Sequence, residues 1–218
     1  MAHSVLTATP GRDLWRSRWR DVAFAALWLP LAFSTWTAWE VRRAPLALPL
    51  LAENLLIMVL FLARRQSRKV APSPNAWILA MLGTLAPLLM RPAIALGAQS
   101  ASSSPLQVVS LGLQGLAVLG ILAALARLGR SFGVVPAHRG LVNDGLYGHV
   151  RHPIYAFEMA FYVAFVLGNL SVANGAVLVT FIVTQILRAH QEERLLRSDL
   201  RYRNYTRRVR FRFIPGLL

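Results

Sequence analysis

Apolar residues in this chain gather into long blocks that are separated by short polar stretches. Several blocks come close to the about 20 residues that an α-helix needs to cross the hydrocarbon core of a bilayer. The blocks predict six membrane helices, at residues 22–39, 46–63, 76–90, 106–128, 154–167 and 176–187. The last helix continues without a breaker into RAHQEERLLRSDL, so its end should project out of the membrane. We therefore predict an all-α, polytopic membrane helix bundle that ends in a helical hairpin.

The composition is that of an integral membrane protein. Hydrophobic residues make up 56% of the chain and charged residues only 15%, with a mean hydropathy of +0.47, whereas soluble domains carry about a quarter charged residues. We expect a single domain over residues 1–218, in which a four-span scaffold (1–128) precedes a C-terminal part (129–218). The chain has no cysteine, which excludes disulfides, thiolate metal sites and cysteine nucleophiles.

The net charge of +15 would suggest a nucleic-acid partner in a soluble protein. The positions of the basic residues favour another explanation. With a cytoplasmic N-terminus and six alternating helices, the 24 lysines and arginines all fall on the cytoplasmic side except Arg42, Arg43 and Arg91. Cytoplasmic loops of membrane proteins carry this excess of positive charge. We therefore predict a multi-pass protein of the cytoplasmic (inner) membrane with both termini in the cytoplasm and no nucleic-acid partner.

The first 20 residues are polar and basic. Trp15 and Trp19 lie one helical turn apart among arginines, which is typical of a helix at the lipid headgroups. A disordered basic leader that only sets the topology fits equally well. No small-residue cleavage site follows the next apolar block, so we expect no signal peptide.

The stretch Pro136–Tyr155, which reads PAHRGLVNDGLYGHVRHPIY, is too rich in polar residues and glycines to be a simple connector. Its glycines permit backbone shapes that other residues resist. Pro153 suits the first turn of the next helix, where its missing N–H costs nothing. We interpret the stretch as a shaped polar binding loop at the edge of the bundle.

This loop and the polar tail after residue 187 are the two ends of one helical hairpin. Both are predicted on the cytoplasmic side, so they should meet in space, where a soluble ligand could reach them. Within the tail, Arg188 and Glu192 are four residues apart and share a helix face. Alone they would indicate only a surface ion pair, which contributes little to stability. Beside the loop, they become candidates for binding opposite charges.

Other motifs add little. A histidine before a proline, such as His152, can simply bond to the loop backbone at a helix start. The five histidines do not fall at metal-ligand spacings, and we expect no metal. No glycine-rich phosphate-binding motif is present.

Four polar residues lie within the predicted membrane helices: Glu53, Asn54, Glu158 and Gln185. Ionisable residues at membrane depth are candidates for function, and hydrogen bonds between helices explain the neutral ones equally well. Glu158 lies about one turn beyond Tyr155, near the loop, and is therefore the stronger candidate of the two glutamates.

Four motifs in the last 90 or so residues occur in a recognisable order: GLYGHVRHPIY (145–155), RAHQEERLL (188–196), YRNY (202–205) and RFIP (212–215). Together they resemble the isoprenylcysteine carboxyl methyltransferase family, whose C-terminal part is similar to that of phospholipid N-methyltransferases. The resemblance implies a membrane-integral enzyme that uses S-adenosylmethionine. The first four predicted helices share with that family only their membrane-spanning character and none of its sequence motifs.

The resemblance also implies roles for individual residues. The cofactor would be bound on the cytoplasmic side by Leu141, Val142, Tyr147, His152, Pro153, Tyr155 and Glu192. Glu192 would receive the cofactor's ammonium group, a charge-assisted contact. Arg188 would be the catalytic residue that faces the acceptor's carboxylate.

We therefore favour a methyltransferase that modifies a carboxylate on a lipid-like or isoprenylcysteine-type acceptor, which enters sideways from the bilayer among the membrane lipids. Methyl transfer from a sulfonium needs alignment more than acid–base groups, so the lack of a catalytic triad is no objection. The alternatives are a phospholipid amine N-methyltransferase, a membrane reductase that uses NADPH, and a non-enzymatic transporter or accessory protein. The sequence sets neither the acceptor's identity nor the oligomeric state.

Overall fold

The structure is a computed structural model that describes residue 19 and residues 21–42, 47–63, 74–90, 105–131 and 141–217. The predicted headgroup helix around Trp15, the basic cluster at 64–69 and the start of the binding loop at 136–140 lie outside the described residues. The α-helices are α2 (Leu29–Arg42), α3 (Ala47–Ala63), α4 (Pro74–Leu85), α5 (Pro105–Leu128), α6 (Pro153–Gly168), α7 (Val172–Leu196) and α8 (Leu200–Arg208). Short 3₁₀ turns are η1 (Ala86–Leu89), η3 (Gly129–Ser131) and η4 (Gly145–Gly148).

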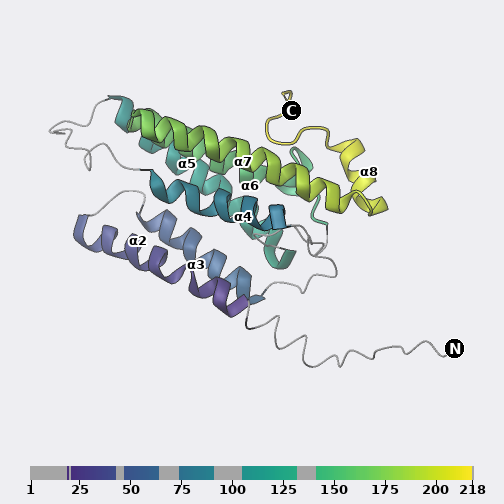
Figure 1. Ribbon diagram of the computed structural model, residues 1–218, viewed down its shortest axis with the longest axis horizontal. Coiled ribbons are helices and arrows are strands. Elements are labelled where there is room, and N and C mark those ends of the chain that lie inside the picture. The colour runs from purple at the N-terminus through teal and green to yellow at the C-terminus, as the bar shows by residue number, and fades with distance from the viewer. Residues whose placement is uncertain are drawn as a thin grey trace.

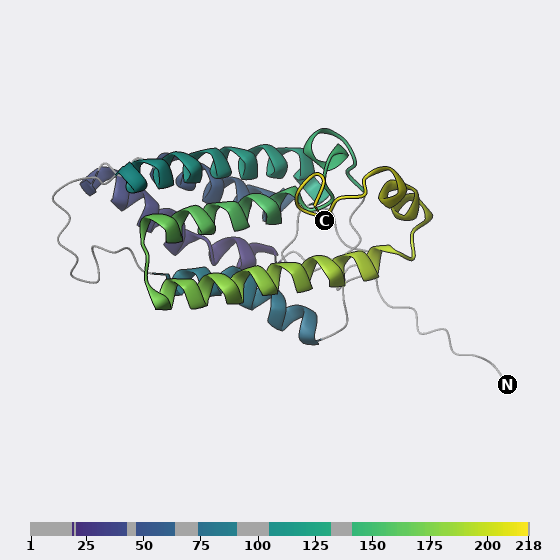
Figure 2. The same cartoon turned by 90° about the horizontal axis from the view of Figure 1, so that it is seen from above.

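The helices α2 to α7 run side by side in one bundle, and α8 lies across one end of it (Figures 1 and 2). Three stretches are long and apolar enough to cross a membrane: Asp21–Val41, Pro105–Ser131 and Val172–Leu196. Shorter apolar helices cover Leu50–Ala63, Pro74–Leu89 and Pro153–Gly168. These six segments correspond to the six predicted membrane helices, and the prediction of an all-α membrane bundle is confirmed.

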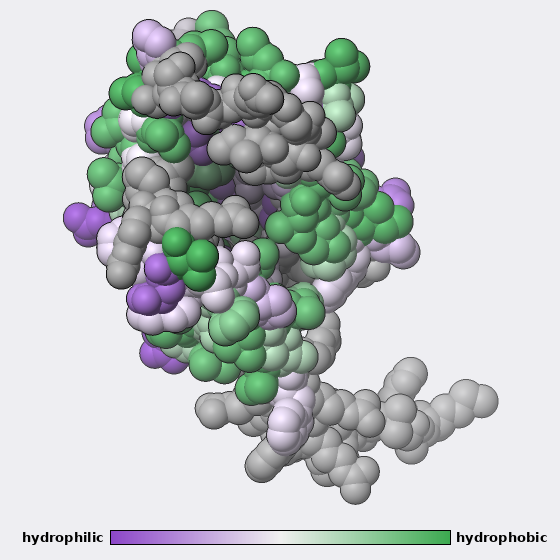
Figure 3. Space-filling view, turned by 90° about the vertical axis from the view of Figure 1, so that its left-hand side faces the viewer, coloured by the Kyte–Doolittle hydropathy of each residue, from purple (hydrophilic) through white to green (hydrophobic). Residues whose placement is uncertain are grey.

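The outer surface of the bundle is largely apolar, as expected for a surface that faces lipid. Large hydrophobic side chains such as Leu116 on α5 and Val179 on α7 are exposed. Seen from the left-hand side of Figure 1, green apolar residues cover much of the flanks (Figure 3). Contiguous exposed apolar surface of this kind marks contact with a membrane or another protein.

Helices α5 and α6 pack against each other more extensively than any other pair of described elements, and close approach explains why. A Cβ atom at Gly120 would lie 2.5 Å from the ring of Phe157, so only glycine lets this ring pack against α5. Further along the pair, the buried Ser110 hydroxyl donates to the Ala164 carbonyl over 2.6 Å. Buried polar groups need such partners, and this one fastens the two helices together.

Helix ends differ from the prediction at positions where a capping side chain starts a helix or a proline interrupts one. The third segment was predicted as one helix to residue 90, and Pro87 converts its last turn to the 3₁₀ helix η1. Helix α7 was predicted from residue 176, and it begins at Val172 because the Ser171 side chain caps it, accepting from the Asn174 amide. It ends at Leu196, before Asp199 caps α8. The hairpin turn is therefore shorter than predicted.

The binding loop and the chain after α7 lie at the same end of the bundle, as predicted. Helices α3 and α5 both end there, since the Arg130 guanidinium donates to the Ala63 carbonyl over 2.9 Å. Helix α6 begins at this end and α7 ends at it (Figure 2). We call it the site end. That the site end faces the cytoplasm stays a prediction.

Candidate functional site

The described part of the binding loop has a defined shape. Residues 141–143 have no regular structure, and η4 follows at 145–148. Gly145 has φ +56°, a conformation that L side chains avoid. The Tyr205 hydroxyl on α8 donates to the Tyr147 carbonyl over 2.7 Å. The loop is therefore held against α8 as well as against the bundle.

The C-terminal segment docks on the start of α6. The amides of Arg151 and His152 donate to the carbonyls of Phe211 (3.0 Å) and Arg212 (2.8 Å). The Arg151 guanidinium donates to two further carbonyls of the same segment, those of Val209 and Arg210. Residues 209–212 thus close the site end beside His152.

Glu193 joins the loop, α7 and this C-terminal segment. Its side chain is only 3% exposed, and its carboxylate accepts from Arg151 Nε over 2.8 Å. His152 Nε2 lies 3.3 Å from the same carboxylate oxygen, and Arg212 Nε lies at 3.3 Å as well. Arg197 is a fourth basic partner, at 3.9 Å. Glu193 directly follows Glu192 in the motif RAHQEERLL, and it was not predicted as a site residue. A buried carboxylate with several basic partners is costly to unpair, so Glu193 holds the site together.

These elements enclose a cavity of about 100 Å³ at the site end, which we call the loop cavity. It is lined by Leu128, Leu141, Val142, Tyr147, Arg151, His152, Pro153, Ile154, Tyr155, Glu192, Leu196, Tyr202 and Tyr205. All seven residues predicted to bind a cofactor are among them. The structure thus brings together residues from both ends of the hairpin, and their role in cofactor binding stays a prediction.

The loop cavity combines one carboxylate with aromatic side chains. The Tyr155 hydroxyl donates to Glu192 over 3.3 Å, and the Tyr155 ring stacks on His152 with centroids 5.5 Å apart. The Glu192 side chain is 33% exposed. Its carboxylate can therefore still accept an ammonium group from a ligand.

Two tyrosines from α8 line the loop cavity and were not predicted as site residues. Burial raises the pKa of the Tyr202 and Tyr205 hydroxyls above the usual range, so both stay protonated as donors. Tyr205 uses its hydroxyl within the protein. The Tyr202 hydroxyl is buried and has no hydrogen-bond partner among the described residues. Such a group calls for an explanation, and a bound ligand would supply one.

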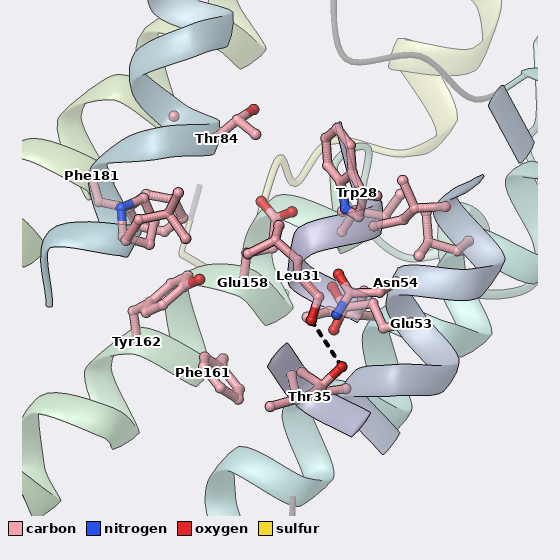
Figure 4. Close-up of a pocket in the computed structure, with 18 of the residues that line it drawn as sticks. Trp28, Leu31, Thr35, Glu53, Asn54, Thr84, Glu158, Phe161, Tyr162 and Phe181 are labelled. Carbon is pink, nitrogen blue, oxygen red and sulfur yellow. Dashed lines mark hydrogen bonds between the residues drawn. The ribbon is translucent and has the colours of Figure 1, made fainter. Parts of the chain in front are cut away.

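A second cavity of about 280 Å³ lies within the bundle, and we call it the membrane cavity. Its size is close to the about 300 Å³ at which small-molecule sites begin. Its lining comes from six helices and includes the polar residues Ser34, Thr35, Glu53, Asn54, Thr84, Glu158, Tyr162 and Arg188. Figure 4 shows Glu53 and Asn54 on one side of this space and Glu158 and Tyr162 on another. The Thr35 and Thr84 hydroxyls are engaged with the carbonyls of Leu31 (3.0 Å) and Ala80 (2.8 Å), and Glu158 and Arg188 both bond to Gln185.

Arg188, the predicted acceptor-binding residue, lines the membrane cavity rather than the loop cavity. It is only 6% exposed, and its Nη1 donates to Gln185 Oε1 over 2.7 Å. Its guanidinium also lies 5.0 Å from the centroid of the Tyr155 ring. Since Tyr155 lines the loop cavity and Ile154 lines both cavities, the two cavities are neighbours.

The comparisons with known proteins bear on a part of the chain that supplies most of the loop cavity. The family model described as phospholipid methyltransferase matches residues 106–201, which run from α5 to the start of α8. No curated protein matches the chain. Enzymes of this family generally use S-adenosylmethionine. Over residues 106–201 the protein is thus similar to phospholipid methyltransferases, which supports a membrane methyltransferase as its activity.

Proposed function

We propose that this protein is an S-adenosylmethionine-dependent methyltransferase with its cofactor in the loop cavity and a lipid-like acceptor in the membrane cavity. The observation that carries the proposal is that the two cavities are neighbours, since they share Ile154 as a lining residue and the Tyr155 ring of the loop cavity lies 5.0 Å from the Arg188 guanidinium of the membrane cavity. A polar cofactor dissolves in water, whereas a lipid acceptor dissolves in the bilayer. A methyltransferase that acts on lipids therefore needs one site open to water and one site open to the bilayer, close enough for the methyl group to pass from one to the other.

The lining of the loop cavity fits S-adenosylmethionine. Glu192 would receive the ammonium group, and the Tyr202 hydroxyl would gain the partner that it lacks among the described residues. Tyr147, His152 and Tyr155 offer flat surfaces for the adenine and the sulfonium, a cation that aromatic faces attract. When bound, the cofactor supplies an electrophilic methyl group for an acceptor oxygen or nitrogen.

For the acceptor, the favoured candidate is a carboxylate such as that of an isoprenylcysteine. A guanidinium can hold a carboxylate through two parallel hydrogen bonds, which also orients the attacking oxygen. Arg188 is the only positively charged group among the described residues that line the membrane cavity. The exposed apolar flanks would let the prenyl chain lie in the bilayer.

A second candidate is the amine of a phospholipid headgroup, and one observation favours it specifically. Glu53 and Glu158 both line the membrane cavity (Figure 4), and carboxylates bind ammonium groups and repel carboxylates. The family match with phospholipid methyltransferases agrees with this candidate. Arg188 would then hold the phosphate of the same headgroup.

The experiment that tests the proposal is a titration of S-adenosylmethionine into detergent-purified protein, with NADPH as the control ligand. We expect S-adenosylmethionine to bind and NADPH not to bind. Binding of NADPH alone would replace the methyltransferase by the reductase alternative. Binding of neither ligand would favour a non-enzymatic role.

Transfer of labelled methyl groups to a prenylcysteine analogue and to phosphatidylethanolamine then decides between the acceptors. Ester formation on the analogue supports the carboxylate candidate, and methylation of the lipid amine alone supports the second candidate.

A further inference from the structure

We infer that Gly83, Gln185 and Glu158 are positioning residues, which together fix the Arg188 guanidinium at the boundary between the two cavities. The inference rests on the proposed function, since it concerns how the acceptor-binding arginine is aimed. It assigns a role to α4, which lies outside the matched residues 106–201.

The first step is the orientation of the Gln185 amide. Gln185 is fully buried, its Oε1 accepts from Arg188 Nη1 over 2.7 Å, and its Nε2 donates to the Glu158 carboxylate. A guanidinium can only donate. Arg188 therefore holds the amide in one orientation, because the flipped amide would set its NH₂ group against the guanidinium donor.

Gln185 also acts as a spacer between Arg188 and Glu158. A direct ion pair between the two would occupy the guanidinium and direct it towards α6. The interposed amide gives one N–H of Arg188 a neutral acceptor in place of a carboxylate. A long charged side chain such as that of Arg188 can adopt many rotamers. The hydrogen bond to Gln185 favours one of these rotamers.

Gly83 on α4 provides a wall beside both Arg188 and Gln185. A Cβ atom at this position would lie 2.7 Å from Arg188 Nη1, 2.9 Å from Arg188 Cδ and 3.1 Å from Gln185 Oε1. Contacts this short do not occur without displacement, so the arginine lies directly against the backbone of α4. Helices α4 and α7 pack against each other along this contact. Any side chain at position 83 would push the guanidinium away from its seat.

The Tyr155 ring, 5.0 Å from the guanidinium, provides a third surface. Arg188 is thus held by α4, α6 and its own helix, and its direction is set before an acceptor arrives. Preorganised groups of this kind matter because a misplacement of about 1 Å can lower a rate by about 100-fold.

The test compares two substitutions, Gly83→Ala and Gln185→Glu, with the control Gly112→Ala. Gly112 lies within α5 and has no atom within 4 Å of an added Cβ. Alanine is normally favoured over glycine inside a helix, so Gly112→Ala should keep or raise the melting temperature. Gly83→Ala should instead lower it, and should lower it much less when combined with Arg188→Ala, because the two shortest contacts of the added Cβ are with Arg188 and only the 3.1 Å contact with Gln185 remains. Equal melting temperatures for Gly83→Ala and Gly112→Ala would overturn the inference, whether or not the protein shows methyl transfer.

Kinetics provide the second measurement. In Gly83→Ala and Gln185→Glu, turnover of the methyl acceptor should fall by about 10- to 100-fold, with the dissociation constant of S-adenosylmethionine unchanged. In the Arg188→Ala background neither substitution should lower turnover further. Additive losses would show that they act independently of Arg188 and would refute the positioning role while the methyltransferase proposal stands. Failure of S-adenosylmethionine to bind the wild-type protein would instead contradict the proposed function itself.

Discussion

The Arg188 guanidinium lies 5.0 Å from the centroid of the Tyr155 ring, although the two residues line different cavities. A cation over an aromatic face is stabilised by about 0.5–2 kcal/mol, more when water is excluded. Tyr155 therefore has two functions at once. Its ring supports Arg188 beside the membrane cavity, and its hydroxyl donates to Glu192 in the loop cavity.

Substitution Tyr155→Phe should separate these two functions. The ring remains for Arg188, and the hydrogen bond to Glu192 is lost. A hydrogen bond of this kind contributes about 0.5–1.5 kcal/mol, so the dissociation constant of S-adenosylmethionine should rise by about three- to tenfold with the acceptor KM unchanged. Tyr155→Leu, which removes the ring as well, should also raise the acceptor KM. Calorimetry and initial rates measure the two effects, and a raised acceptor KM in Tyr155→Phe would contradict this division.

Glu192→Gln should weaken cofactor binding more strongly. The substitution keeps the size of the side chain and removes the charge that would face the cofactor's ammonium group. Hydrogen bonds to charged groups contribute about 1.5–3 kcal/mol, which corresponds to about 10- to 100-fold in the dissociation constant. Glu40→Gln, an exposed glutamate on α2, is the control. An unchanged dissociation constant in Glu192→Gln would remove Glu192 from the site.

Tyr202→Phe and Tyr205→Phe form a matched pair on α8. The Tyr205 hydroxyl donates to the Tyr147 carbonyl over 2.7 Å, so its removal should lower the stability of the apo protein by about 1–3 kcal/mol. The Tyr202 hydroxyl has no hydrogen-bond partner among the described residues, so its removal should not lower apo stability. If S-adenosylmethionine uses this hydroxyl, Tyr202→Phe should still weaken cofactor binding. A destabilised Tyr202→Phe with normal cofactor affinity would show that the hydroxyl serves the fold.

The helices and their alternation could be predicted because each membrane segment is a continuous apolar block. Successive membrane helices cross in opposite directions, so the loop before α6 and the chain after α7 had to lie on the same side of the membrane. Their proximity could therefore be predicted from the order of the helices alone. Helix ends were less predictable, since they depend on single side chains. Ser171 begins α7 earlier than the glycine and asparagine residues around it suggested, and Asp199 separates α8 from α7.

Seven of the residues that line the loop cavity could be predicted from their motifs, whereas Tyr202, Tyr205 and the contacts that hold the cavity together could not. Glu192 and Glu193 are adjacent in sequence, and only the packing shows that Glu193 turns towards Arg151 while Glu192 faces the cavity. The seat of Arg188 against Gly83 was equally hidden, because residues on α4 and α7 are about 100 positions apart. The sequence signal for the interior of the bundle was the presence of polar residues within apolar blocks. This signal identified Glu53, Glu158 and Gln185 as candidates for a functional role or for hydrogen bonds between helices.

The orientation of the bundle in the membrane is testable because the chain has no native cysteine. Val172 is exposed at the start of α7, and Ser198 is exposed just beyond its end. We expect Ser198→Cys to react with a membrane-impermeant thiol reagent from the cytoplasmic side only, and Val172→Cys from the opposite side only. Labelling of both variants from the same side would contradict the single crossing of α7, and the reversed pattern would place the loop cavity outside the cytoplasm.

Arg188→Lys tests what the buried guanidinium does for the acceptor. Lysine keeps the positive charge and loses the planar fork that can hold a carboxylate or a phosphate through two hydrogen bonds. The shorter ammonium would also lose the close seat against Gly83. Turnover should therefore fall by about tenfold or more, with cofactor affinity nearly unchanged because Arg188 does not line the loop cavity. If Arg188 serves only to fill the space between α4 and α7, Arg188→Lys should lower the melting temperature and leave the turnover of the folded protein intact. Measuring both on the same preparation, with the prenylcysteine analogue and phosphatidylethanolamine as acceptors, separates a role in binding the acceptor's anionic group from a role in packing.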